Sequence, residues 1–354
     1  MKSKPPNFLD PLIALPAGVF RTLALTRRAA YDHGILRSID VGVPVISIGN
    51  ITAGGTGKTP ITAMIADELE KREISCAIVS RGYGGSIKGP ARVDSNGVTE
   101  TAKKFGDEPA WYAARDPSLP VYVGADRVET ALMAIRETQP KVILADDAFQ
   151  HRRLRRSLDI VVLDSTQPRW HYRPLPLGRA REDLSSMTRA QSVFVTKTNM
   201  APTDQLTWIR KAVGMFRARS GFSVFEFESV ITGFFPLADG PVVSDSKVDL
   251  RKARVLLVSG IGRPHTFEEL VRKSGAEIVE HLMFRDHHMY TDGDLKEIER
   301  HAAKTQVDAV LVTEKDAVKL SHWKPNVPCF VSRLQARPAG IMDRFYEDVD
   351  RLLI

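Results

Sequence analysis

Residues 47–60 read SIGNITAGGTGKTP, a glycine-rich run that ends in the triplet Gly-Lys-Thr followed by proline. The run follows a β-branched apolar stretch over 43–48 and precedes 61–69, where apolar residues recur at helical spacing. A strand, a glycine-rich loop and a helix in this order form the setting of a phosphate-binding P-loop. Backbone N–H groups and the helix N-terminus then surround the phosphate oxygens. We therefore expect this loop to hold a nucleoside triphosphate.

Two residues of the loop have defined chemical roles. Lys58 is expected to contact the β- and γ-phosphates and to assist catalysis, and the Thr59 hydroxyl is expected to ligate Mg²⁺. The first glycine of the P-loop pattern is replaced by Thr52, so we expect Gly54 and Gly55 to supply the turn. A plain glycine turn is the simpler interpretation, but Gly-Lys-Thr at this place disfavours it. The residues predicted to bind the nucleotide are Thr52, Ala53, Gly54, Gly55, Thr56, Gly57, Lys58 and Thr59.

Length and composition narrow the class of protein. A chain of 354 residues can form two domains of about 100–200 residues each. Hydrophobic content of 43% and charged content of 26% are typical of a soluble globular protein. The net charge of +7 favours an anionic partner, such as nucleic acid, a membrane surface or a phosphorylated substrate. The two cysteines are far apart in the sequence, which indicates buried free thiols in a reducing compartment.

Strand-like and helical segments alternate along most of the chain. Short apolar strands separated by helices predict an α/β fold with a parallel sheet covered on both faces. Helices are expected over 58–71, 108–114, 126–137 and 203–216, and a surface hairpin or excursion over 84–100. The domain boundaries predicted from these patterns are an N-terminal amphipathic segment over 1–40, a P-loop domain over 41–222, an extended linker over 223–250 and a smaller α/β domain over 251–354. A cleft between the two domains is the expected ligand site.

The N-terminal segment 8–34 is apolar but is interrupted by Asp10, two prolines and Arg21. A membrane-spanning helix needs about 20 nearly uncharged apolar residues, so this segment is a poor candidate for one. Its paired arginines follow the apolar part, unlike those of a secretory signal. The pattern predicts an amphipathic helix lying on an anionic membrane surface. The alternative is an amphipathic helix that packs on the body of the protein. The residues expected to share its apolar face are Val19, Phe20, Leu23 and Leu25.

The second informative motif is VILADDAFQHRRLRR over 142–156. Asp146 and Asp147 end an apolar strand, where a P-loop enzyme places the carboxylate that holds Mg²⁺. The two acids could instead start a turn. Many arginines follow, which form either a solvated face or an anion-binding site. They lack interleaved aromatic residues, so we expect no nucleic-acid partner. These arginines are Arg152, Arg153, Arg155, Arg156, Arg169, Arg173, Arg179 and Arg181.

Two further loops carry titratable residues. In KFGDEPAWYAAR (104–115), Asp107 either caps a helix or accepts a proton from an attacking hydroxyl. In MFRDHHMYTDGDL (283–295), Asp286, His287 and His288 lie between a strand and a helix that is capped near Thr291. Three titratable groups in a loop between elements favour a functional site.

Taken in order, the motifs resemble one known family. They are GNITAGGTGKTP, SRGYGG, GDEP, VGADR, LADDAFQHRRLRRSLDIVVLD, LPLGRAREDL, TKTN, SGIGRP, FRDHHMYT and TEKDAVK. The chain resembles the tetraacyldisaccharide 4'-kinases, the lipid A 4'-kinases of Gram-negative bacteria, over nearly its whole length. The resemblance implies a P-loop kinase domain and a second α/β domain.

The resemblance also implies an activity. Such enzymes transfer the γ-phosphate of ATP to the 4'-hydroxyl of a lipid A disaccharide 1-phosphate, which gives lipid IVA, at the cytoplasmic face of the inner membrane. It implies Asp107 as general base assisted by His287. It also implies Asp146 and Asp147 as the metal-binding acids, together with the Thr59 hydroxyl.

Two other classes share part of the pattern. AGGTGKT also resembles the loop of membrane-positioning and partitioning ATPases, but these carry a second lysine where this chain has Ala53. A GTPase would need an Asn-Lys-x-Asp loop, of which TKTN (196–199) is a poor imitation. The sequence therefore favours the kinase.

Overall fold

The computed structural model describes residues 11–94, 98–237 and 247–353, and the chain divides into two compact units. Unit 1 comprises Met1–Ser75, Pro140–Glu228 and Ala336–Ile354. Unit 2 comprises Cys76–Gln139 and Ser229–Gln335. These units group residues 76–139 with the C-terminal half, whereas the sequence pattern places them in a continuous P-loop domain. The contiguous domain boundaries therefore stay a prediction.

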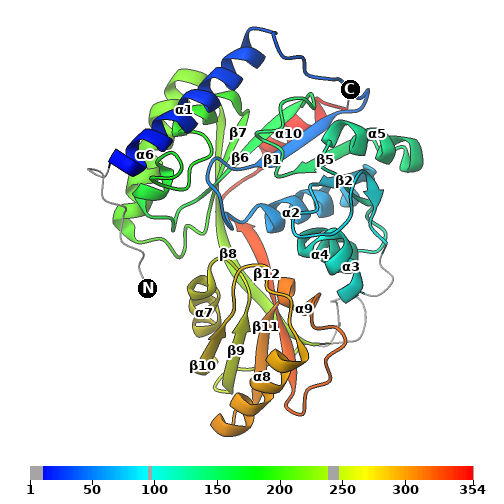
Figure 1. Cartoon of the computed structure of the whole chain (residues 1–354), viewed down its shortest axis with the longest axis vertical. Coiled ribbons are helices and arrows are strands. Elements are labelled where there is room, and N and C mark those ends of the chain that lie inside the picture. The colour runs from blue at the N-terminus through cyan, green and yellow to red at the C-terminus, as the bar shows by residue number, and fades with distance from the viewer. Residues whose placement is uncertain (1–10, 95–97, 238–246, 354) are drawn as a thin grey trace. The chain divides into compact units, whose positions relative to one another are not determined.

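Unit 1 is built on a parallel sheet with the strand order β8–β7–β6–β1–β5 (Figure 1). Strand β1 is central, and all of its residues are buried, as the continuous apolar run of a doubly covered parallel strand requires. The elements are α1 (Pro11–Asp32), β1 (Val45–Gly49), α2 (Lys58–Lys71), β5 (Val142–Asp146), β6 (Leu158–Asp164), η1 (Arg169–Tyr172), η2 (Leu184–Arg189), β7 (Ser192–Thr196), α6 (Thr203–Ser220), the first part of β8 (Ser223–Pro236) and α10 (Asp343–Asp350).

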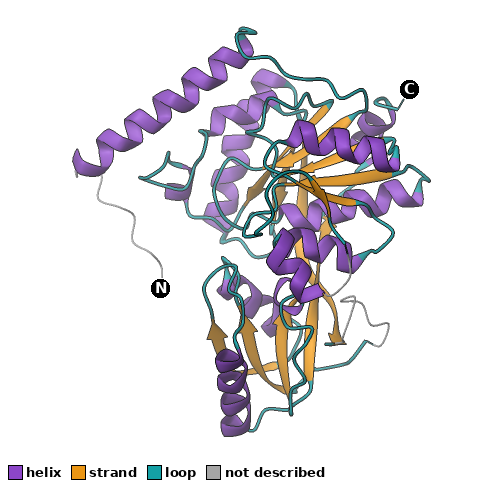
Figure 2. Ribbon diagram, turned by 45° about the vertical axis from the view of Figure 1, so that its right-hand side comes forward, coloured by secondary structure: helices purple, strands orange, loops and turns teal. Residues whose placement is uncertain are grey.

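Helices cover both faces of this sheet (Figure 2). Successive side chains of a strand point to opposite faces. On one side of β7, Val193 and Val195 pack into a cluster with Ile209 of α6. On the other side, the ring of Phe194 meets the ring of Phe345 from α10 at a centroid distance of 5.3 Å. The predicted mostly parallel α/β fold with covered faces is therefore confirmed.

Unit 2 contains a second set of parallel strands, β9, β10 and β11, continued by β12 and the latter part of β8 (Figure 1). A smaller group pairs β2 with β4 in parallel and β3 with β4 antiparallel. The elements are β2 (Cys76–Ser80), β3 (Ala91–Arg92), α3 (Val98–Phe105), α4 (Asp107–Arg115), β4 (Val121–Val123), α5 (Arg127–Thr138), β9 (Arg254–Ser259), α7 (Pro264–Lys273), β10 (Glu277–Met283), α8 (Asp292–Thr305), β11 (Ala309–Thr313), α9 (Glu314–Ala317) and β12 (Cys329–Pro338).

The local signals in the sequence locate most of these elements. The helices expected over 58–71 and 126–137 are α2 and α5, and α8 begins with the expected cap at Thr291, which forms a capping box with Asp294. The segment 84–100 carries the short strand β3 and the start of α3, a helix that the sequence pattern did not predict. Among the described residues, no helix combines the length and apolar character needed to span a membrane.

The packing of α10 gives a first prediction. Phe345 is fully buried in the aromatic cluster of unit 1, whereas Ile341, which precedes the same helix, is 81% exposed. Phe345→Ala should lower the free energy of unfolding by about 3–5 kcal/mol because it leaves a cavity in the core. Ile341→Ala should change it by less than about 0.5 kcal/mol. Denaturant unfolding of the two variants and the wild type measures both values, and equal effects would contradict this packing.

Candidate functional site

The P-loop connects β1 to α2 within unit 1. Gly54 and Gly57 adopt left-handed backbone conformations, with φ of 109° and 91°, which glycine adopts without strain. The sequence predicts that Gly54 and Gly55 supply the turn, and the glycines of this loop with a positive φ are Gly54 and Gly57. Gly57 is also the N-cap of α2 and has no side chain to cap the helix. The N–H groups of the first turn of α2 are therefore left facing the loop.

Thr52, the residue that replaces the first glycine, is buried and forms an antiparallel bridge with Ala180. The next N–H group, that of Ala53, donates to the Arg179 carbonyl oxygen at 2.7 Å. The segment LPLGRARED thus runs beside the start of the P-loop. A Cβ placed on Gly54 would lie 3.6 Å from Nη1 of Arg179, which puts that guanidinium next to the loop.

A second segment supports the P-loop from the end of β7. The Thr196 hydroxyl donates to the Thr56 carbonyl oxygen at 2.8 Å. The Lys197 ammonium donates to the Gly55 carbonyl oxygen at 3.0 Å and to the Asp164 carboxylate at 2.7 Å. The sequence pattern of TKTN, which resembles a family motif and is a poor guanine-reading loop, did not predict this contact with the P-loop. The signal available was a lysine directly after an apolar strand, which does not identify its partner.

Asp146 and Asp147 stand at the end of β5, next to the P-loop strand. Asp146 is opposite Ile48 in the β1–β5 register and is fully buried. Asp147 forms ion pairs with Lys58 at 3.4 Å and with Arg181 at 3.1 Å. Burial alone would raise the pKa of Asp147, but the positive charges of Lys58 and Arg181 hold it well below its usual range. The structure therefore brings the predicted P-loop lysine and one predicted acid together.

Five of the eight predicted arginines have informative positions, at carboxylates or beside the P-loop. The first run is bound to carboxylates within unit 1: Arg152 pairs with Asp32 at 2.7 Å, Arg155 with Asp40 at 3.0 Å and Arg156 with Asp159 at 2.9 Å. The later residues Arg179 and Arg181 lie at the P-loop and at Asp147 instead. The two arginines of LPLGRARED therefore lie next to the P-loop. Arg152, Arg155 and Arg156, which follow the acidic motif, instead form ion pairs with carboxylates of the protein itself.

Asp107 and His287 form a hydrogen-bonded pair in unit 2. His287 Nδ1 lies 3.0 Å and 2.9 Å from the two carboxylate oxygens of Asp107. Asp107 begins α4, but the N-cap is Gly106, and no side chain caps this helix. The carboxylate therefore faces His287 rather than capping its own helix. The sequence pattern placed the two residues in different predicted domains, and the structure has both in the same compact unit.

The two members of this pair change each other's proton affinity. Burial alone would raise the pKa of Asp107, but the hydrogen bond from His287 and the charge of Lys315 lower it to about 2. The same hydrogen bond raises the pKa of His287 above its usual value, against the effect of burial. Asp107 is nearly buried, with 7% of its side chain exposed, whereas 32% of the His287 side chain is exposed. A proton taken up near neutral pH therefore resides on the more exposed imidazole.

The other titratable residues of this loop have different positions. His288 stacks on Phe284 and contacts the Asp294 carboxylate at 3.0 Å, which ties it to the start of α8. An Asp286 oxygen lies 3.8 Å from Nε2 of His287. Of the three residues predicted here, His287 alone pairs with Asp107 among the described contacts.

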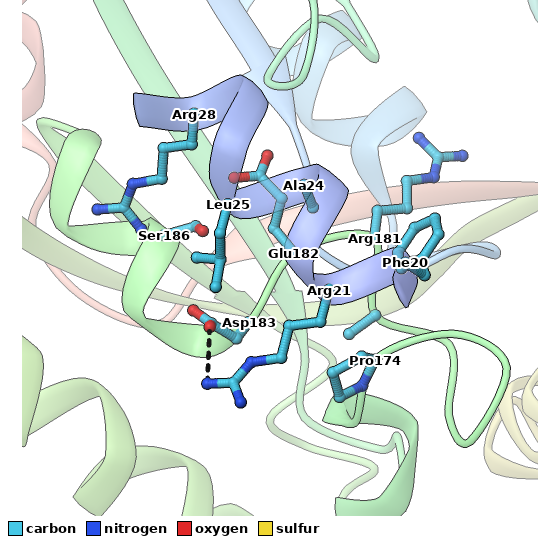
Figure 3. Close-up of a pocket in the computed structure, with 11 residues that line it drawn as sticks. Phe20, Arg21, Ala24, Leu25, Arg28, Pro174, Arg181, Glu182, Asp183 and Ser186 are labelled. Carbon is cyan, nitrogen blue, oxygen red and sulfur yellow. Dashed lines mark ion pairs between the residues drawn. The ribbon is translucent and has the colours of Figure 1, made fainter. Parts of the chain in front are cut away.

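The N-terminal helix α1 packs on unit 1 through one face and is exposed on another. Phe20, Ala24 and Leu25 of α1 line a small pocket together with Glu182 and Asp183 (Figure 3). The Arg21 guanidinium lies 4.0 Å from the Asp183 carboxylate (Figure 3). On the exposed face, one helical turn apart, the side chains of Leu15, Val19 and Leu23 are 74%, 54% and 65% exposed.

Comparison with known proteins agrees with these features. The family model described as tetraacyldisaccharide-1-P 4'-kinase matches residues 9–352. A tetraacyldisaccharide 4'-kinase of Bdellovibrio bacteriovorus is 36% identical over 330 residues, which cover 91% of this chain and 93% of the relative. That of Anaeromyxobacter sp. Fw109-5 is 39% identical over 354 residues, which cover 98% of this chain and 92% of the relative.

A solved structure is also similar. It is the crystal structure of LpxK from Aquifex aeolicus, described as an apo form in complex with ATP, with a TM-score of 0.76 and 26% identity. The match covers 96% of this chain and 98% of the solved chain. The resemblance predicted from the motifs is therefore confirmed, and with it the kinase class of the enzyme. This chain belongs to the tetraacyldisaccharide 4'-kinase family.

Proposed function

We propose that this enzyme binds ATP in the P-loop of unit 1 and transfers its γ-phosphate to the 4'-hydroxyl of a lipid A disaccharide 1-phosphate, which forms lipid IVA. The observation that carries the proposal is the cluster of Lys58, Asp147 and Arg181 beside the glycine loop. Loop backbone N–H groups and these cations suit a triphosphate. The ATP in the Aquifex aeolicus crystal structure supports the same ligand. A switch ATPase of the partitioning class is disfavoured by the family to which the chain belongs.

Within this proposal, the P-loop residues Thr52–Thr59 hold the phosphates. Lys58 is bound to Asp147, so its charge is partly balanced while no phosphate is near. A phosphate group entering the loop competes with Asp147 for the ammonium. Lys58 then stabilises the charge that develops on the transferred phosphoryl group.

The donor atoms at this place fit a magnesium ion. Thr59, Asp146 and Asp147 offer a hydroxyl and two carboxylates, and Mg²⁺ takes hard oxygen ligands and keeps several waters. Thr59 and Asp146 are both buried at the junction of β1, β5 and α2. When bound, the ion neutralises phosphate charge. The chain's own contribution is to keep Asp147 ionised through Lys58 and Arg181.

We further propose that Asp107 and His287 accept the proton of the attacking hydroxyl as one coupled pair. A carboxylate whose pKa is about 2 is a weak base by itself. His287, whose pKa is raised by Asp107, supplies the proton affinity, and Asp107 orients its ring through Nδ1. Nε2 is then the nitrogen that takes the proton. The two residues titrate as a coupled pair, so an observed pKa is a property of the pair and not of either residue alone.

For the lipid substrate we propose that α1 lies on the anionic cytoplasmic face of the inner membrane. Leu15, Val19 and Leu23 offer an exposed apolar stripe, and Arg21 and Arg27 lie on the same helix as exposed cations. Such a helix binds an interface through apolar burial and attraction to anionic lipid. The proposal includes no nucleic-acid partner.

The first test concerns the P-loop. Lys58→Ala should lower kcat by at least about 100-fold, because one fixed cation at the transferred phosphoryl group is lost. Lys71→Ala, at the other end of α2 with a 73% exposed side chain, is the matched control and should keep wild-type activity. The measurement is transfer of labelled γ-phosphate from ATP to purified disaccharide 1-phosphate. Near wild-type transfer by Lys58→Ala at saturating ATP would refute the loop assignment.

The second test concerns the proton. Asp107→Asn and His287→Ala should each lower kcat by about 10²–10⁴-fold, whereas Asp116→Asn at the other end of α4 should not. The double variant should lose much less kcat than the product of the two single losses.

The same assignment predicts a pH dependence. His287 must be neutral to accept a proton, so wild-type kcat should fall as the pH drops through a midpoint above about 6.5. In Asp107→Asn that midpoint should move down, because the group that raises the pKa is gone. A midpoint unchanged in Asp107→Asn would sink this assignment.

The third test concerns the membrane. Replacing Leu15, Val19 and Leu23 together by serine should weaken binding to vesicles that contain anionic lipid, because the exposed apolar stripe is lost. Binding of the wild type should also weaken with salt, since exposed charges are screened over about 10 Å at 0.1 M. Met215→Ser, a 52% exposed apolar residue of α6 in the same unit, is the control. Vesicle co-sedimentation measures both. Equal binding by the triple variant and the control would argue that α1 serves packing alone.

A further inference from the structure

The short helix α9 carries the motif TEKDAVK, which the proposed reaction leaves without a role. Its residues Glu314, Lys315 and Asp316 are consecutive, and each contacts a different neighbour in unit 2. Glu314 accepts a hydrogen bond from the Leu334 N–H of β12 at 2.9 Å, which fixes the helix to the sheet. Lys315 contacts Glu108, the residue next to Asp107, and Asp316 is linked to His287 through Gly260.

Asp316 is fully buried and joins three loops. Its carboxylate accepts the Gly260 N–H at 3.1 Å from the loop after β9, and the Tyr290 hydroxyl at 3.0 Å from the loop after β10. It also accepts the Thr313 hydroxyl at 2.6 Å at the end of β11. The ammonium of Lys319, itself buried, lies 3.0 Å from the same carboxylate and balances its charge.

The connection from Asp316 to His287 runs through one residue. Gly260 donates its N–H to Asp316 and accepts the His287 N–H through its carbonyl oxygen at 3.1 Å. His287 has a left-handed backbone with φ of 60°, which non-glycine residues adopt only where the surroundings hold them. A Cβ on Gly260 would approach the His288 Cβ at 3.1 Å and the Asp316 carboxylate at 3.2 Å, so the loops are closely packed here.

Lys315 acts on the other member of the pair. Its ammonium forms an ion pair with Glu108, the residue that follows Asp107 at the start of α4. Helices α4 and α9 lie in contact. Neighbouring residues of one four-residue helix thus hold the helix that begins with Asp107 and the loop that carries His287.

We propose that Lys315 and Asp316 are positioning residues that set the Asp107 carboxylate and the His287 imidazole at hydrogen-bonding distance. The inference rests on the proposed role of that pair. Two side chains from separate elements stay within 2.9 Å only if both backbones are held, and small displacements of reacting groups reduce rates strongly. Asp316 touches neither the pair nor its protons, so it acts through the backbone of Gly260.

The main test variant is Asp316→Asn, with Asp308→Asn as the matched control. Asp308 accepts the Arg254 N–H at 2.8 Å and so holds the opposite end of the same strands, β9 and β11. We expect Asp316→Asn to lower kcat about 10-fold, with the KM values for ATP and lipid within twofold of wild type. Asp308→Asn should keep the wild-type kcat. Equal kcat values in the two variants would overturn the proposal.

Asp316→Asn leaves Lys319 buried without its countercharge and can prevent folding. Two milder variants keep the proposal testable. Asp316→Asn combined with Lys319→Met removes both charges, and Tyr290→Phe removes one hydrogen bond to Asp316 while keeping the ring. Both variants should lower kcat, as Asp316→Asn alone does, without a change in KM. Wild-type kcat in both folded variants would also overturn the proposal.

A spectroscopic readout separates positioning from general destabilisation. ¹H–¹⁵N NMR of the His287 ring reports the proton that Nδ1 shares with Asp107. The charged and titratable groups that face this ring are Asp107, Asp286 and Lys315, and Tyr83 packs against it. We expect Asp316→Asn and Lys315→Met to weaken this signal. Asp316→Asn should also lower the midpoint of the His287 titration, whereas Asp308→Asn should leave both the signal and the midpoint unchanged. An unchanged ring signal in Asp316→Asn would count against positioning.

A double-variant cycle tests whether Asp316 acts through His287. In a His287→Ala background, adding Asp316→Asn should cost no further kcat, because the group that it positions is absent. If the loss of kcat in the double variant equalled the product of the two single losses, Asp316 would act independently of His287. If instead the proposed role of the pair in proton transfer were wrong, His287→Ala would keep normal kcat. In the protein that retains His287, the NMR signal of its ring would still respond to Asp316→Asn.

Discussion

A loop that turns its backbone N–H groups toward an anion must expose its carbonyl oxygens on the outside, and these need partners. In unit 1 the buried ion pair of Lys197 and Asp164 supplies them. Asp164 ends β6, Lys197 follows β7, and the same ammonium binds the Gly55 carbonyl oxygen. Breaking a buried pair leaves an uncompensated charge and is strongly destabilising. The shape of the P-loop therefore depends on the order of the strands behind it, which brings the ends of β6 and β7 to its outer side.

At the P-loop and at the Asp107–His287 pair, a buried carboxylate is kept ionised by different kinds of cation. Burial raises the pKa of a carboxylic acid, yet both Asp147 and Asp107 are kept ionised by neighbouring cations. At Asp147 the cations are permanent, so the carboxylate stays charged at every physiological pH. At Asp107 the principal partner is His287, whose charge changes near neutrality. The first arrangement suits a fixed charge beside phosphate, and the second suits a group that takes up a proton.

Helix α1 shows how one amphipathic pattern serves two surfaces. The sequence left membrane contact and packing on the protein as alternatives. In the structure α1 packs on the protein through the buried Ala17 and through Phe20, and it carries an exposed stripe that includes Leu15 and Leu23 on another face of the same helix. The two interpretations do not exclude each other, because an α-helix of this length presents more than one face. Membrane contact stays a prediction that rests on that exposed stripe.

The sequence by itself determined the local elements: the P-loop between a buried strand and α2, the acids at the end of β5, and the family. Each depends on residues close together in the chain, where spacing and glycine geometry decide the outcome. Only the tertiary structure decided that Lys197 supports the loop, that Arg179 and Arg181 lie beside it, and that Asp107 meets His287 within one unit. Apolar periodicity indicates which residues of a strand are buried, but not which strands are neighbours. Contacts between distant segments depend on that strand order, and the sequence pattern does not contain it.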